Sequence, residues 1–217
     1  VERVAQDAAR SARKGGWLTT AVSGMALMAS GVSLWESTLK QPDLKVYVTD
    51  SLSYTRDPWG GYEVLAIPMT IANGGARDGA VIAMTLDIKT ATGKSETFTS
   101  AYTVDATYFG ATDDVSARRR RPKLPFAPLS IAGRSAYSGT VLFYPAEFRE
   151  QKAVEPKSRI DMVLRIATPG PDGIIDKALS RRTEAIRLAA DVPNFLPGAL
   201  LSGEMARLRL ASGTAAP

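Results

Sequence analysis

The stretch Leu44–Val48 reads LKVYV and introduces the pattern that decides the fold. Every second residue is apolar (Leu, Val, Val), and Lys45 and Tyr47 lie between them, which is the period of two expected of a half-buried strand. Comparable runs follow along the chain: residues 62–72 (YEVLAIPMTIA), 80–89 (AVIAMTLDIK), Ser95–Val104, residues 135–144 (SAYSGTVLFY) and Arg159–Ala167. We therefore expect six or seven short strands within residues 44–168.

Turn signals separate these runs, because Gly and Asn can adopt a positive φ. They occur at residues 57–61, 73–75, 92–94 and 132–134. No long helical period intervenes, so the spacing predicts an antiparallel β-sandwich. Its general form resembles immunoglobulin-like domains in architecture only, since their cysteine pair and core Trp are missing. Pro68 cannot donate a ladder hydrogen bond, and it predicts an edge strand or a bulge at that point.

Residues 17–35, WLTTAVSGMALMASGVSLW, contain no charged residue. At about 1.5 Å per residue this stretch approaches the roughly 30 Å of a bilayer core. Trp17 and Trp35 stand at its ends, as interfacial Trp residues do, and basic residues precede it. The pattern predicts a single transmembrane helix. A cleaved signal peptide and a buried helix of a soluble protein are the alternatives.

By the positive-inside rule, the basic residues before the predicted transmembrane helix place the N-terminal side of the chain in the cytoplasm and the rest outside it. Residues 1–16 form a cytoplasmic segment, residues 36–43 a connector, and residues 44–168 the β-sandwich outside the cytoplasm. The expected location is the bacterial inner membrane, with the main domain in the periplasm.

Small and polar residues recur at spacings of three and four along the predicted helix and form one stripe. The stripe consists of Thr20, Ser23, Gly24, Leu27, Ser30, Gly31 and Leu34. Small residues let helix backbones approach closely, so the stripe predicts packing against other transmembrane helices. Alternatively, the hydroxyl groups bond to carbonyl groups of their own helix.

The period of the sequence becomes helical again within residues 169–217. Apolar residues fall on one side of the expected helix: Ile174, Ile175, Ala178, Leu179, Ala185, Ile186, Ala189 and Ala190. This pattern predicts an amphipathic helical tail, which Pro193 ends, followed by a second apolar segment at residues 200–210. The apolar face suits the protein's own sheet, a partner subunit or a membrane surface.

Composition limits the chemistry. The 217 residues include no Cys and no His, which excludes Ser-His-Asp and Cys-His catalysis and most zinc sites. The net charge of +5 comes from two segments of the chain. Residues 1–35 contain four basic and two acidic groups, and residues 112–123 contain five basic and two acidic groups. No broad basic face for nucleic acid is predicted. We expect no cofactor, no metal site and no enzymatic activity.

Three local features are candidates for contacts or chemistry. Basic residues gather on one predicted loop and suit an acidic protein surface or an anionic lipid, or form a solvated loop: Arg118, Arg119, Arg120, Arg121 and Lys123. The aromatic residues Tyr54, Trp59 and Tyr62 gather near one turn and predict a contact surface or a core corner. Ser37 and Lys40 have the Ser-x-x-Lys spacing, but they lie in the connector, where burial of the lysine is not expected.

Together these features predict a non-catalytic accessory or scaffolding subunit of a bacterial inner-membrane complex. Its partners are other integral membrane subunits. The alternative is a stand-alone membrane-anchored adaptor or sensor that binds an acidic ligand or lipid head group through the basic loop.

Overall fold

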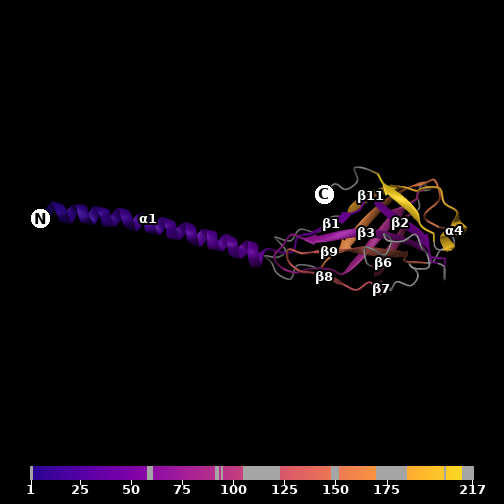
Figure 1. Ribbon diagram of the computed structural model, residues 1–217, viewed down its shortest axis with the longest axis horizontal. Coiled ribbons are helices and arrows are strands. Elements are labelled where there is room, and N and C mark those ends of the chain that lie inside the picture. Colours follow the sequence, from indigo (N-terminus) through magenta and orange to yellow (C-terminus); the bar gives the residue numbers. More distant parts are fainter. Residues whose placement is uncertain are drawn as a thin grey trace.

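The protein consists of one long helix and a β-rich body (Figure 1). The computed structural model describes residues 2–57, 61–90, 93, 95–104, 123–147, 152–169, 185–202 and 204–211, without the side chains of residues 2–16 and 18. Helix α1 (Glu2–Leu34) continues into a short π-helix, η1 (Trp35–Leu39), and projects away from one end of the body.

The described part of the body contains twelve strands and one further short helix. They are β1 (Leu44–Val48), β2 (Ser51–Arg56), β3 (Glu63–Asn73), β4 (Gly79–Val81), β5 (Ala83–Lys89), β6 (Ser95–Val104), β7 (Leu124–Pro125), β8 (Leu129–Ile131), β9 (Ala136–Pro145), β10 (Arg159–Ala167), β11 (Ile186–Asp191), α4 (Pro197–Leu201) and β12 (Ala206–Leu210).

Eight of these strands form one closed sheet. Their hydrogen-bonded order is β3-β2-β12-β11-β10-β5-β6-β9, and β9 then pairs with β3 again. All of these pairs are antiparallel. Beside this closed sheet, β1 pairs with the second half of β3, β7 pairs with the end of β6, and β4 and β8 form a separate pair.

The closed sheet corrects the predicted fold. The protein is mainly β, but the predicted immunoglobulin-like sandwich is wrong, because a sandwich has two sheets with separate edges. Strand β9 joins β3 to β6 on one side, and β12 joins β2 to β11 on the other. Alternation in the sequence indicates which face of a strand is buried, but not which strand lies next to it.

The predicted edge position of Pro68 is wrong, but an irregularity does lie beside it, because the register with β3 shifts between β1 and β2. Strand β3 has neighbours on both sides: β9 on one, and β1 and β2 on the other. Thr49 N–H donates to the carbonyl oxygen of Pro68 (3.4 Å) at the break between β1 and β2. In an antiparallel strand the N–H and C=O of one residue face the same side, so the missing donor faces this break and no bond to β9 is lost.

The predicted helical tail is wrong where the structure describes it. Residues 185–190, read as part of an amphipathic helix, lie in and next to β11, and the apolar segment at residues 200–210 contains β12. Both strands belong to the closed sheet. The ARLRL of β12 alternates apolar and basic residues, and its buried positions are Ala206 and Leu208. Residues 174–179 lie outside the described residues.

The predicted transmembrane helix over residues 17–35 is wrong as well. Among the residues whose side chains the structure describes, no helix combines the length and apolar character needed to cross a membrane. Helix α1 is interrupted by polar residues such as Thr19, Thr20 and Ser23, which offset its apolar ones. The periplasmic location of the β-rich body is not tested by the structure and stays a prediction.

The main hydrophobic core lies inside the closed sheet. Inward-facing side chains from most of its strands are fully buried there, including Tyr54, Ile67, Leu86, Phe98, Phe143 and Leu164. A smaller buried cluster, Val64, Ala66, Val104 and Leu142, is formed by alternate residues of the same strands. The body therefore has its own core, to which α1 does not contribute among the described residues.

Candidate functional site

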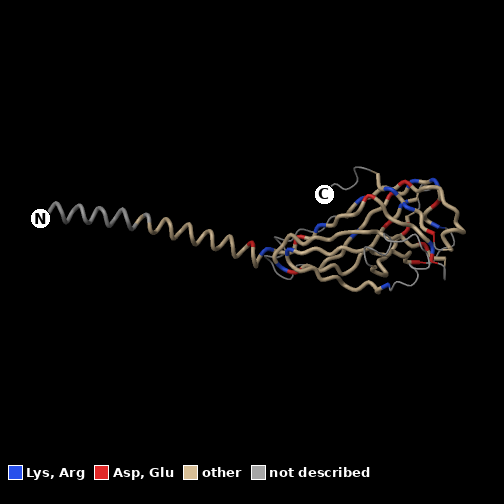
Figure 2. The backbone as a smooth tube through the Cα atoms, in the orientation of Figure 1, with Lys and Arg blue, Asp and Glu red and all other residues tan. Residues whose placement is uncertain are grey.

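Helix α1 has an exposed apolar surface. Trp17, Leu27 and Met28 are each more than 70% exposed, at 72%, 75% and 74%. Exposed large apolar side chains continue along the helix at Val22, Met25, Val32 and Leu34. Residues 17–34 contain no Lys, Arg, Asp or Glu, and Figure 2 shows this part of the helix without blue or red up to its end. This surface can contact other apolar helices without burying a charge.

The predicted packing stripe lies on this exposed helix. Its residues are exposed, apart from the partly exposed Gly24, and a Cβ atom at Gly24 or Gly31 would meet no atom within 4 Å. Ser30 donates its hydroxyl hydrogen to the carbonyl oxygen of Ala26 (2.8 Å), so this hydroxyl is bonded within its own helix, as the alternative interpretation proposed. The stripe is therefore sterically open, and its function as a packing face stays a prediction.

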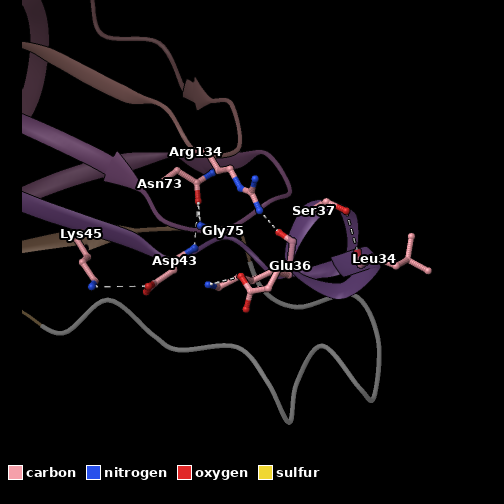
Figure 3. A network of polar contacts seen from close by, with 9 residues as sticks. Leu34, Glu36, Ser37, Asp43, Lys45, Asn73, Gly75 and Arg134 are labelled. Atoms are coloured by element: carbon pink, nitrogen blue, oxygen red, sulfur yellow. Dashed lines mark hydrogen bonds and ion pairs between the residues drawn. The ribbon is translucent and has the colours of Figure 1, made fainter. Parts of the chain in front are cut away.

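The junction between the helix and the body is held by a network that we call the collar (Figure 3). The collar comprises residues 40–43 after η1, residues 73–79 from the end of β3 to the start of β4, and residues 131–135 from the end of β8 onward. At its centre lies Asn73, which is only 2% exposed. Its Oδ1 accepts hydrogen bonds from the N–H groups of Asp43 (3.2 Å) and Gly75 (2.9 Å). Its Nδ2 donates to the carbonyl oxygens of Arg77, Ile131 and Ala132.

The backbone segments of the collar touch directly, and two glycines permit this contact. A Cβ at Gly75 would lie closer than 3.0 Å to the carbonyl oxygen of Gln41, and one at Gly133 equally close to that of Ala76. Lys40 O accepts hydrogen bonds from the N–H groups of Ala76 (3.0 Å) and Arg77 (3.1 Å). The chain leaving the helix is thus bonded to the β3–β4 loop through its backbone.

Arg134 connects the collar to the end of the helix. Its guanidinium donates to the carbonyl oxygen of Glu36, and its own N–H donates to Gly75 O (2.9 Å). Arg134 has a φ of 58°, which is uncommon for a residue with a side chain. A cation near a helix C-terminus is favourable because unpaired carbonyl groups carry partial negative charge there. The collar therefore fixes the direction in which the helix leaves the body.

The other predicted sites are only partly described. Arg118, Arg119, Arg120 and Arg121 lie outside the described residues. Lys123 is described and exposed; its Nζ lies 5.9 Å above the ring of Tyr102 and donates to the hydroxyl of Tyr144 (3.4 Å). The binding of an acidic ligand by the basic loop stays a prediction.

The predicted aromatic contact surface is not formed as a group. Tyr54 is fully buried, Tyr62 is 38% exposed, and Trp59 lies outside the described residues. The hydroxyl of Tyr54 donates to Glu63 Oε1 (2.8 Å). Burial, and next the negative charge of Glu63, raise the pKa of Tyr54 well above its ordinary value. Tyr54 is therefore a core residue and not part of a contact surface.

Glu63 is a buried acid that the sequence did not single out. Besides the Tyr54 hydroxyl, its carboxylate accepts hydrogen bonds from the N–H groups of Ala153 (2.9 Å) and Val154 (3.0 Å). These donors fix the segment before β10 against β3, so the group has a structural role. Ser37 lies in the exposed η1 and Lys40 directly after it, where Lys40 Nζ pairs with Glu36 Oε2 (3.1 Å).

Asn73 and Arg134 were also missed as functional residues. Both residues lie in turns that the sequence indicates, at 73–75 and 132–134, and these are the only local signals. The partners of Asn73 come from three separate segments of the chain, so no local pattern indicates its role.

Comparison with known proteins leaves the family undetermined. No protein-family profile matches the sequence, and no curated protein matches it. A crystal structure of a Bordetella pertussis protein, provisionally named ApaA, is similar with a TM-score of 0.32 and 16% sequence identity. The match covers 80% of this chain and 98% of that one.

Proposed function

We propose that this protein is a non-catalytic interaction subunit of a larger protein assembly, and that it docks through helix α1 against apolar helices of its partners. The observation that carries the proposal is the exposed apolar surface of α1 on a helix that the collar holds away from the body. Large exposed apolar side chains on one helix that no part of its own protein covers are typical of a surface that contacts another molecule.

The energetics of α1 favour a partner. Full burial of a large apolar side chain contributes about 1.5–3 kcal/mol, and α1 leaves Trp17, Leu27 and Met28 mostly in solvent. Gly15, Gly16, Gly24 and Gly31 each disfavour the helix by about 1 kcal/mol relative to Ala. Partner helices would offset both effects, because small residues let them approach the α1 backbone closely.

The residue types of the sequence support a non-catalytic role. Without His and Cys, the commonest general base and the thiolate nucleophile are missing from the protein. The buried acid Glu63 is occupied by three structural donors.

The test is purification of the tagged full-length protein from its native host, followed by quantitative mass spectrometry. We expect a stoichiometric partner set that is lost in the Met28→Asp variant. The matched control is Ile82→Asp, because Ile82 is an exposed apolar residue (47%) on the body and not on α1. The partner set should survive that change.

Gly24→Leu and Gly31→Leu refine the same test. Neither substitution meets an atom of the protein at its Cβ, so both variants should fold normally. Each should weaken the association if partner helices pack closely against the stripe. A protein that purifies alone, or a partner set that Met28→Asp and Ile82→Asp affect equally, would contradict the proposal.

A further inference from the structure

The closed sheet lacks one described strand at the end from which α1 leaves. At the other end β12 lies between β2 and β11 and bonds to both. Near α1, β1 takes the place of β2 beside β3, and among the described residues no strand pairs with the other edge of β1. Strand β12 pairs with β11 only at Ala190 and Asp191, so the first part of β11 is unpaired on that side. We call the space between β1 and this part of β11 the strand gap.

Backbone groups of β1 face the strand gap. Asp43 O accepts from Gly74 N (2.9 Å) and Thr49 N donates to Pro68 O, so the odd-numbered residues here face β3. In an antiparallel strand the intervening residues turn their N–H and C=O groups the other way. The even-numbered residues of β1 therefore present these groups to the gap: Leu44, Val46 and Val48.

The opposite edge of the gap is formed by β11. Val192 N donates to Ser158 O (2.8 Å) on the β10 side, whereas Ala189 O accepts from Ala211 N (2.9 Å) on the β12 side. Odd-numbered residues of β11 thus face β12, and the N–H and C=O of Arg187 face the gap. A strand that continues the position of β12 would find hydrogen-bonding groups on both sides.

The floor of the gap is a poorly covered part of the main core. Inward side chains beside it pack on the core but are only partly buried: Leu44, Val46, Val48, Ile186 and Leu210. Inward side chains away from the gap, such as Ile67 and Phe143, are 0% exposed. Apolar residues on an incoming strand would complete this part of the core.

The rim of the gap carries basic side chains. Lys45 on β1 and Arg187 on β11 are exposed and lie on the outer face of their strands. Asp43, 4.0 Å from Lys45, is the acidic residue that pairs with this rim. Alternate residues of an incoming strand would point outward between Lys45 and Arg187, where acidic residues form favourable cross-strand pairs.

We propose that the strand gap binds an extended segment of a partner protein in which apolar residues alternate with Asp or Glu. The segment adds a strand between β1 and β11, so backbone hydrogen bonds hold it and its alternation selects it. This surface is separate from the apolar face of α1, and the proposal does not depend on the docking of that helix.

The test uses a fluorescein-labelled synthetic peptide, Glu-Val-Glu-Ile-Glu-Val-Glu, and fluorescence anisotropy with the full-length protein. A peptide of the same composition without alternation, and one with Lys in place of Glu, are the peptide controls. We expect only the alternating acidic peptide to bind.

Two protein variants locate the binding. Val46→Pro removes an N–H group that faces the gap and not β3. It should weaken the binding of the acidic peptide at least about tenfold. The double variant Lys45→Glu and Arg187→Glu should bind the Lys peptide in preference to the Glu peptide. This double variant changes exposed residues only, so it keeps the test decisive if Val46→Pro does not fold. Met28→Asp on α1 should leave peptide binding unchanged, which separates this proposal from the proposed function.

Three results would overturn the proposal. The first is a lack of binding to any alternating peptide. The second is binding that neither variant changes. The third is binding that occurs only in a variant ending at Ala211, which would mean that the protein's own last residues fill the gap.

Discussion

Helix α1 and the closed sheet differ in the burial of their apolar side chains. In the closed sheet, side chains such as Phe98 and Phe143 are fully buried and every strand has two neighbours. Along α1, side chains of similar apolar character are mostly in solvent, and only the collar connects the helix to the body. The difference teaches that the body buries its apolar residues by its own contacts, whereas those of α1 stay exposed among the described residues, which is why we propose a partner for the helix.

The largest expected difference comes from removing one apolar side chain in each region. Phe143→Ala should lower the free energy of unfolding by about 3–5 kcal/mol, because the side chain is fully buried and leaves a cavity. Leu27→Ala, on α1, should change it by less than about 0.5 kcal/mol. Urea unfolding of both variants, followed by circular dichroism in the β-sheet region, measures this. Equal losses would show that α1 packs on the body.

Asn73→Ala tests the collar, where the two regions meet. The substitution removes the acceptor of the buried Gly75 N–H and of the part-buried Asp43 N–H, and a buried donor left without a partner costs about 1–3 kcal/mol. We expect a loss of at least about 2 kcal/mol in urea unfolding and faster proteolysis between η1 and β1. Thr70→Ala is a matched control, since the Thr70 hydroxyl bonds to Ser138 at the surface. A loss no larger than in this control would contradict the role of Asn73.

The buried Tyr54 predicts a pH dependence that belongs to the body alone. The pKa of Tyr54 is raised in the folded protein, whereas in the unfolded chain it is near 10. As the pH rises, Tyr54 therefore loses its proton in the unfolded chain before it does so in the folded protein. This contribution to stability is complete below about pH 10 and decreases as the pH rises further, by up to about 1.4 kcal/mol per pH unit. Unfolding should be measured between pH 8 and 11. Tyr54→Phe should show a smaller decrease, and an identical one would argue against burial of the hydroxyl.

The smallest effect is expected at an exposed ion pair. Arg165 Nη1 lies 2.8 Å from Asp87 Oδ2, and its side chain is largely exposed. Arg165→Ala should lower the free energy of unfolding by no more than about 1 kcal/mol, and the loss should shrink in high salt. A loss comparable to that of Phe143→Ala would mean that the surface of the sheet contributes as much as its core.

The sequence predicted the strands better than their arrangement. The predicted runs coincide with β1, β6 and β10, and in β1 and in most of β10 the less exposed residues alternate with exposed ones. It failed for β11, whose consecutive buried residues Leu188, Ala189 and Ala190 also fit a helical period. The closure of the sheet depends on pairs between distant segments, such as β2 with β12, and no local pattern specifies them.

The candidate site was predicted unevenly for similar reasons. The absence of charge in residues 17–34 and the small residues there are visible in the sequence, and they predict a surface for partners, which stays a prediction. They also led to the wrong prediction of a transmembrane helix. The collar was not predictable, because Asn73 and Arg134 act through backbone groups that only the folded chain brings together.

Hydrogen–deuterium exchange tests the central claim most directly. It is measured by mass spectrometry on the isolated full-length protein and on the assembly purified from the native host. In the isolated protein, we expect fast exchange for the amides of α1 between residues 17 and 34 and slow exchange for β3 and β9. In the assembly, exchange in α1 should slow by at least about 100-fold while β3 and β9 change little. An α1 that is as protected as β9 in the isolated protein, or unchanged in the assembly, would contradict the account.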